Sequence, residues 1–389
     1  MTTPTAGRRH ELDALRGLAA ASILAYHAFA MVAPSREALW LLFCSPAFPI
    51  VNGRPAVILF FVLSGFVLHG ALSAEQERRG RVDYRGFILK RVCRIYLPFA
   101  AAAFLALVMA TLAVRFGTLA TEAVPKPMAG WPAAASFEPS VFAGLLTLSG
   151  VETDMALNSV AWSLVHELRI SLVLPALFLL VRSRGAATLL VATAPAWIAC
   201  QALESPVFAS IPPTMAEATF QSFSSVAASL TATIYYLPMF LMGALAAERA
   251  PRLWALLDRL GPAKTAACFL AGYVLLWWPN DIAAAVGAAL LVVLVARSGT
   301  CRRLAGLRAP AFLGRVSYSL YLIHLPLLQA VVLVFGGVLG APLSLLLGVV
   351  LAIPAAALFA RTVEAPSQRL GRRLAERPAP LAAALAPAE

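Results

Sequence analysis

A cation and a titratable base share one face of the first apolar segment, residues 11–29. Arg16 and His27 are eleven residues apart, which is close to three helical turns and about 16 Å of rise. Asp13 lies one turn before Arg16. Ionisable side chains within a bilayer usually face a bundle interior or a water-filled cavity. The spacing predicts a helix with Asp13 and Arg16 near one membrane surface and a general base, His27, deeper in the bundle.

Two other interpretations fit this segment. The Arg16 side chain can extend along the helix to the membrane surface, with His27 as a packing residue. The segment also has the outline of a secretory signal peptide, with two arginines before an apolar run that ends in Ala-Phe-Ala. The charges of Asp13 and Arg16 within the run argue against a signal peptide, as does the apolar composition of the rest of the chain.

A second group of cations begins the third apolar segment. Arg91 and Arg94 are three residues apart and so share a helix face. Guanidinium groups are permanently charged and bind phosphate through two hydrogen bonds at once. The pair therefore suits a phosphate-bearing ligand. The alternative is an ordinary membrane anchor that binds lipid headgroups.

Polar residues also interrupt two other apolar segments. Ser64 precedes Gly65, a pair that suits close helix packing better than nucleophilic catalysis, because the glycine elbow around a catalytic serine is missing. Glu167 follows Trp162 by five residues, and its carboxylate can orient an imidazole or a sugar hydroxyl. Glu167 and its neighbour His166 must point to different faces, and we expect Glu167 to face the cavity.

A last polar stripe lies in the segment before Pro326. Its serine and tyrosine hydroxyls can bind a substrate or simply link neighbouring helices. The proline can interrupt the helical hydrogen bonds and open a cavity. The stripe consists of Ser317, Tyr321 and His324, which line up at helical spacing, and Tyr318 is the neighbour of Ser317.

Composition places these motifs in a membrane. The 389 residues are 60% hydrophobic and only 13% charged, too little charge for the surface of a soluble protein. Long apolar runs without period-two alternation predict an all-α, polytopic membrane bundle and argue against a β-barrel. We expect about ten transmembrane helices, near residues 12–33, 55–72, 94–115, 163–181, 187–203, 229–248, 265–279, 281–296, 316–336 and 342–360.

The basic residues orient these helices. With the N-terminus in the cytoplasm, twenty-six Lys and Arg residues fall on the inner side and four on the outer side, which predicts that both termini are cytoplasmic. The net charge of +12 thus reflects membrane orientation, and we expect no nucleic-acid partner. Five scattered cysteines predict neither a disulfide framework nor a metal site.

The chain is expected to form a single transmembrane domain, residues 1–376. Residues 377–389 are rich in proline and alanine and are expected to form a disordered tail. The apolar patch at residues 141–148 is too short to cross the bilayer, so we interpret it as a re-entrant or interfacial helix.

Taken together, the motifs closely resemble those of the integral membrane acyltransferase-3 family, which O-acylates sugars and macrolides. The resemblance covers nearly the whole chain, about residues 11–366. Its six motifs occur in family order: Arg16 with His27, Phe60-Phe61-x-x-Ser64-Gly65-Phe66, Arg91-x-x-Arg94-x-Tyr96, Trp162-Ser163-Leu164-x-x-Glu167, Ser317-Tyr318-Ser319-x-Tyr321-x-x-His324, and Glu364-x-Pro366.

The resemblance implies a multi-pass enzyme of the inner (plasma) membrane that uses cytoplasmic acyl-CoA. It transfers an acyl group, acetyl by default, to a hydroxyl of a carbohydrate acceptor such as a cell-surface polysaccharide or glycolipid. No cofactor is bound permanently. The implied catalytic residues are His27, Glu167 and Asp13; Arg16, Arg91 and Arg94 hold CoA phosphates; Ser64, Trp162, Tyr318, Tyr321 and His324 bind substrate.

Several alternatives stay open at this point. The acyl group can move directly to the acceptor, with His27 as a base, or through an acyl-histidine. A transporter or flippase can use buried Arg, His and Glu residues for coupling, although the Arg16–His27 pattern has no second copy in the chain. A non-catalytic membrane scaffold is a third reading. The chain also has Leu168-Arg169-Ile170-Ser171 where many family members have aromatic residues.

Overall fold

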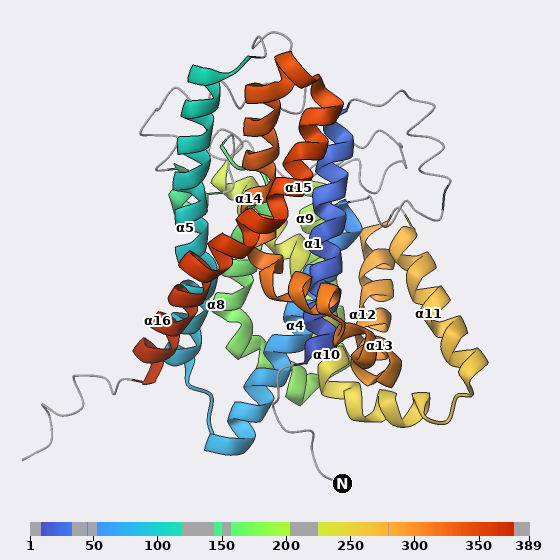
Figure 1. The fold of residues 1–389 in the computed structure, drawn as a ribbon. Coiled ribbons are helices and arrows are strands. Elements are labelled where there is room, and N and C mark those ends of the chain that lie inside the picture. The colour runs from blue at the N-terminus through green and yellow to red at the C-terminus, as the bar shows by residue number, and fades with distance from the viewer. Residues whose placement is uncertain are drawn as a thin grey trace, which may run out of the picture.

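The computed structural model describes residues 9–32, 45, 53–118, 144–149, 157–202, 225–278 and 280–376, and in them it is all-helical (Figure 1). Seven helices are long and apolar enough to cross a membrane. They are α1 (His10–Met31), α4 (Gly53–Arg79), α5 (Tyr84–Phe116), α8 (Ala161–Arg184), α10 (Val226–Leu257), α14 (Arg308–Leu339), and α15 (Ala341–Phe359), which continues through the π-helical turn η4 (Ala360–Glu364) into α16 (Ala365–Glu376).

The three other predicted spans also coincide with helices, but these are shorter. They are α9 (Ala186–Ala202), α11 (Pro262–Trp277) and α12 (Asp281–Arg297). A bend of 85° separates α12 from α13 (Gly299–Ala305), and the two together form an eighth candidate span. Length and composition therefore support seven or eight spans among the described residues. The cytoplasmic position of the termini stays a prediction, and the proposed tail, residues 377–389, lies outside the described residues.

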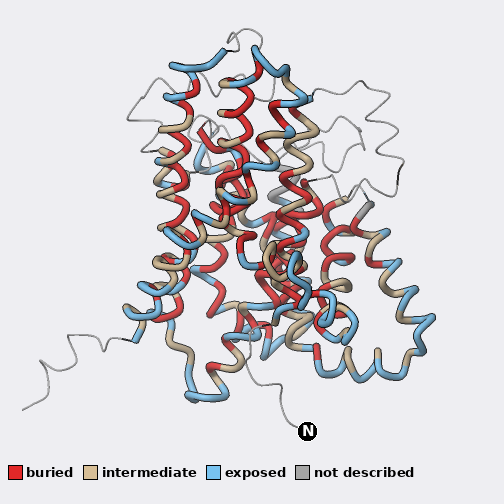
Figure 2. Tube along the Cα trace, viewed as in Figure 1, coloured by how far each residue is buried: buried red, intermediate tan, exposed pale blue. Residues whose placement is uncertain are grey.

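Side chains on the outer faces of the bundle are apolar, as lipid contact requires. Leu190 on α9 and Val338 on α14 are each 73% exposed, and Phe104 on α5 is 60% exposed. Figure 2 shows the buried residues concentrated along the inward faces of the helices. Such large exposed apolar side chains on many helices are unfavourable in water and suit a bilayer.

Glycines bring two helix pairs into close contact. A β-carbon at Gly65 on α4 would collide with the backbone of Phe240 on α10, and one at Gly243 on α10 would collide with the backbone of Val62. A β-carbon at Gly17 on α1 would lie 2.6 Å from the carbonyl carbon of Leu313 on α14. Small residues at such contacts let membrane helices approach closely, so the predicted close packing at Gly65 is confirmed.

The expected break at Pro326 does not occur, since α14 continues through this residue to Leu339. Proline has no N–H, so the carbonyl of Leu322, four residues earlier, loses its helical partner. The Asn158 side chain donates a hydrogen bond from Nδ2 to this carbonyl at 3.0 Å. Asn158 therefore replaces the hydrogen bond that the Leu322 carbonyl loses, and Pro326 does not break the helix to open a cavity.

The short apolar patch enters the bundle. Its first residues, 141–143, lie outside the described part, and residues 144–147 form one helical turn. Leu145 is fully buried, the Tyr96 hydroxyl donates to the Leu146 carbonyl at 2.9 Å, and Arg169 donates to the carbonyls of Leu148 and Ser149. This burial favours the re-entrant reading of the patch over an interfacial helix.

Candidate active site

A cavity of about 1140 Å³ enters the bundle from the end where α4 finishes and α5 begins. This volume is slightly larger than the range of ~300–1,000 Å³ typical of small-molecule sites. We call this end the mouth; exposed residues such as Arg78, Arg79 and Lys90 line it. The side of the cavity away from the mouth is lined by Phe60, Ser163 and Tyr321 among others. The cavity thus runs from a charged entrance to a largely aromatic end.

Cations outnumber acids along this cavity. The acids are Asp13, Glu75, Glu77, Glu167 and Glu364; the cations are Arg9, Arg16, Arg78, Arg79, Lys90, Arg91, Arg94, Arg315, Arg361 and Arg372. An excess of fixed positive charge between low-dielectric walls attracts and holds anionic ligands.

Arg16 and Asp13 lie together in the cavity wall, with Arg16 Nη1 3.5 Å from Asp13 Oδ1. His27 lies fourteen residues beyond Asp13 on the same helix, which corresponds to about 21 Å of rise. The structure therefore does not bring Asp13 together with His27. The predicted catalytic grouping of the two is corrected: Asp13 is an ion-pair partner of Arg16 near the mouth.

The Arg91 guanidinium forms hydrogen bonds with side chains of α8. Its Nη2 donates to Glu167 Oε1 at 2.8 Å and to Ser171 Oγ at 3.1 Å, and the Arg91 side chain is only 8% exposed. The Ser64 hydroxyl also donates to Glu167 Oε1, at 3.2 Å. Glu167 lines the cavity while His166 binds Thr233 at 2.9 Å, as the adjacent positions predicted.

Two sequence expectations are therefore corrected. Glu167 does not orient His27, because its hydrogen bonds go to Arg91 and Ser64. Arg91 does not form a joint phosphate fork with Arg94, because its guanidinium is buried against Glu167. Ser171 was missed as a partner of Arg91, although its spacing of four residues from Glu167 placed both on one face of α8.

Arg94 is the better candidate for an anionic ligand. It lines the cavity, it is exposed, and it forms no ion pair with the residues that the structure describes. Arg91 and Arg94 thus divide two roles that the sequence had assigned jointly: one guanidinium ties α5 to α8, and the other faces the open cavity.

His27 is bonded to His324, a pairing that the sequence did not predict. His324 Nδ1 lies 2.9 Å from the carbonyl oxygens of Leu320 and Tyr321, so this nitrogen must carry a proton and donate it. His324 Nε2 is then an acceptor in the neutral ring, and it lies 3.0 Å from His27 Nδ1. His27 Nδ1 also lies 3.0 Å from the Ile23 carbonyl, another pure acceptor.

The hydrogen bonds fix the tautomer of His27. Its Nδ1 faces two acceptors, Ile23 O and His324 Nε2, and must carry the proton. The lone pair of neutral His27 is therefore on Nε2, which has no hydrogen-bond partner among the described residues. His324 is fully buried and His27 is half-buried. The arrangement is that of a base oriented by a second imidazole, which is in turn held by backbone carbonyls.

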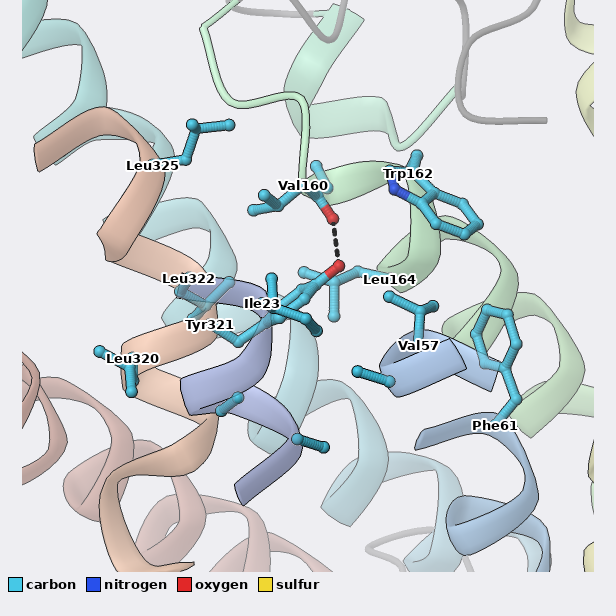
Figure 3. Close-up of a cluster of buried hydrophobic side chains, with 14 of the residues drawn as sticks. Ile23, Val57, Phe61, Val160, Trp162, Leu164, Leu320, Tyr321, Leu322 and Leu325 are labelled. Atoms are coloured by element: carbon cyan, nitrogen blue, oxygen red, sulfur yellow. Dashed lines mark hydrogen bonds between the residues drawn. The ribbon is translucent and has the colours of Figure 1, made fainter. Parts of the chain in front are cut away.

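Neither histidine is among the described residues that line the cavity. Tyr321 does line it, and the Tyr321 ring centroid lies 6.1 Å from that of His324. The Tyr321 hydroxyl donates to the Val160 carbonyl at 2.8 Å and lies 2.7 Å from Ser163 Oγ (Figure 3). Tyr318 also lines the cavity and donates to the Ile95 carbonyl at 2.8 Å. His324 contacts His27, and its predicted contact with substrate stays a prediction.

Trp162 belongs to the core. It is 5% exposed, and its ring packs against Phe61, His166 and Tyr236. Trp162 does not line the cavity, and its ring packs in the core (Figure 3); its contact with substrate stays a prediction. Among the described residues, no group of histidine, cysteine or acidic side chains has the arrangement of a metal site.

A family model described as an acyltransferase domain matches residues 9–361. The chain belongs to the membrane acyltransferase-3 family. This acyltransferase is therefore a multi-pass membrane enzyme, which decides against the transporter and scaffold readings of the sequence. No curated protein and no solved structure matches the chain.

Proposed function

We propose that the acyltransferase moves an acyl group, acetyl by default, from cytoplasmic acyl-CoA to a hydroxyl of a carbohydrate acceptor at the inner (plasma) membrane. The acceptor class is a cell-surface polysaccharide or glycolipid. The observation that carries the proposal is a cavity with a basic mouth whose far end approaches a base of defined tautomer, His27.

The mouth suits the anionic half of the donor. CoA carries several phosphate groups, and Arg94 and Lys90 offer exposed cations on one end of α5. Arg16 lies deeper and is partly neutralised by Asp13. From Arg16 to His27 the rise along α1 is about 16 Å, a distance that the extended pantetheine arm of CoA is long enough to cover. The phosphates would therefore stay near the mouth while the thioester extends toward His27.

His27 Nε2 is the atom that takes the proton of the acceptor hydroxyl. As the hydroxyl oxygen attacks the thioester carbonyl, a carbon–oxygen bond forms and the carbon–sulfur bond breaks. The proton held on His27 then passes to the departing CoA thiolate, which leaves as the thiol. During the step His27 is an imidazolium, and its Nδ1–H donates to His324 Nε2. This charged hydrogen bond is stronger than the one in the resting state, so His324 favours the reaction.

A second route uses the same nitrogen as a nucleophile. The unprotonated Nε2 of His27 would attack the thioester, giving an acyl-histidine and CoA thiolate, and the acceptor hydroxyl would then take the acyl group. Both routes require His27 with a free Nε2. They differ in whether labelled acyl groups can be trapped on the protein without acceptor.

The test is transfer of radiolabelled acetyl from acetyl-CoA by the purified enzyme in proteoliposomes that contain membrane glycan extract. We expect labelled glycan with the wild type and none with His27→Ala. His10→Ala is the matched control, because His10 lies on the same helix and is exposed. Equal transfer by His27→Ala and wild type would overturn the assignment of the base. No wild-type transfer from acetyl-CoA or from other short acyl-CoAs would overturn the donor.

A further inference from the structure

The far end of the cavity is closed by a contact between side chains of three helices. Along α4 the lining residue furthest from the mouth is Phe60, and along α14 it is Tyr321. The two rings meet edge to face, with centroids 5.8 Å apart and an interplanar angle of 82°. Ser163 of α8 completes the closure through its hydroxyl contact with Tyr321 at 2.7 Å.

The closure separates the cavity from the histidine pair. His324 follows Tyr321 by three residues on α14, about 4.5 Å of rise further from the mouth, and their ring centroids are 6.1 Å apart. His27 is bonded to His324 on that far side. An acyl group brought in through the mouth therefore meets the Phe60–Tyr321 contact immediately before it reaches His27.

The two sides of the closure differ in rigidity. The Tyr321 hydroxyl is held by the Val160 carbonyl and by Ser163, so its ring cannot turn without breaking buried hydrogen bonds. Phe60 has no polar group and is only half-buried. Of the two rings, Phe60 is the one that can yield to an incoming group at little cost.

We propose that this end of the cavity is the subsite for the acyl group, and that Phe60 sets the size of the acyl group that the enzyme accepts. The proposal rests on the proposed use of acyl-CoA as donor. A short linear acyl group fits beneath the Phe60–Tyr321 contact and passes Phe60 by a small rotation of its ring. A longer or branched group requires more space than that rotation opens, with Tyr321 fixed on the other side.

Binding of acetyl-, butyryl- and hexanoyl-CoA to the purified enzyme in nanodiscs tests the subsite without requiring turnover. We expect the affinity of wild type to fall with acyl length, and Phe60→Ala to raise hexanoyl relative to acetyl affinity by at least about tenfold, a typical effect of space for an extra methylene or more. Phe60→Trp is expected to shift the preference the opposite way, toward acetyl. Misfolding would instead weaken binding of all three donors together.

Val67→Ala is the matched control. Val67 lies on the same face of α4, seven residues from Phe60 toward the mouth, and also lines the cavity. Its truncation enlarges the cavity away from the far end, so the wild-type preference should remain. The same change of preference in Val67→Ala and Phe60→Ala, or no change in either, would overturn the subsite.

The outcomes also separate the subsite from the proposed function. If wild type transfers acetyl from acetyl-CoA in a His27-dependent manner while Phe60→Ala keeps the wild-type length preference, the subsite is overturned and the proposed function stands. If wild type binds none of the three acyl-CoAs, the donor and the subsite are overturned together.

Discussion

Replacement of His324 separates catalysis from donor binding. In wild type His324 Nε2 accepts a hydrogen bond from His27 at 3.0 Å. When His27 takes up a proton, that bond has a charged donor and is worth about 1.5–3 kcal/mol. Because a tenfold change in rate corresponds to about 1.4 kcal/mol, His324→Ala should lower kcat by about 10–100-fold. His324 does not line the cavity, so the KM for acyl-CoA should stay at its wild-type value.

Steady-state kinetics with acyl-CoA as the varied substrate measures both quantities, and thermal unfolding checks that the variant is folded. His324→Gln is the conservative control, because its amide oxygen can accept the hydrogen bond from His27 and should restore part of kcat. A KM that rises as much as kcat falls would refute this reasoning, since it would place His324 in donor binding. A kcat within twofold of wild type in a folded His324→Ala enzyme would refute it as well.

Two further predictions concern the cavity wall and the helix contacts. Arg94→Gln should raise the KM for acyl-CoA at unchanged stability. Arg91→Gln removes the ion-pair partner of Glu167 and should lower the free energy of unfolding by about 3 kcal/mol. Donor titration and denaturation in detergent measure these two effects, and equal effects of both variants would mean that the two arginines share one role. Gly65→Ala should destabilise the enzyme by about 1–3 kcal/mol, because its β-carbon collides with α10. Gly70→Ala is the control and should be neutral or stabilising, because its β-carbon would contact nothing within 4 Å. Equal melting temperatures of the two variants would contradict the close contact at Gly65.

The helices could be predicted from the sequence because their signals are local. Apolar runs bounded by arginines or turn residues predicted ten segments, and each of them coincides with a helix in the structure. The number of helices that cross the membrane depends on more than local sequence. Helices α9 and α11 are short, and α12 turns by 85° into α13, a bend that apolar composition alone does not reveal.

The partners of the polar residues were beyond sequence reasoning. Periodicity placed Arg91 and Arg94 on one face, yet the first is buried against Glu167 and the second is exposed. The direction in which a residue on a helix points, toward a neighbouring helix or toward the cavity, depends on how the helices pack, for example at the glycine contact between α4 and α10. His27 and His324 are 297 residues apart in the chain, and no local spacing links them.

The effect of Pro326 on helical hydrogen bonding was predicted correctly, but the predicted break in the helix was wrong. The sequence shows that proline removes a helical hydrogen bond from the Leu322 carbonyl. Whether the helix then breaks depends on a replacement donor, and Asn158, 164 residues away, provides it. Asn158 precedes α8 and Ser163 belongs to the Trp162 motif, but their roles follow only from their side-chain contacts with Leu322 and Tyr321 of α14.

Transfer from the inner side through His27 is tested most directly in membrane vesicles of known orientation. Membrane-impermeant acetyl-CoA is added outside inside-out or right-side-out vesicles, and free CoA is measured. We predict CoA release from inside-out vesicles that contain wild-type enzyme and none from those that contain His27→Ala. Equal release from right-side-out vesicles, or from vesicles with His27→Ala, would contradict a cytoplasmic donor that reacts at His27.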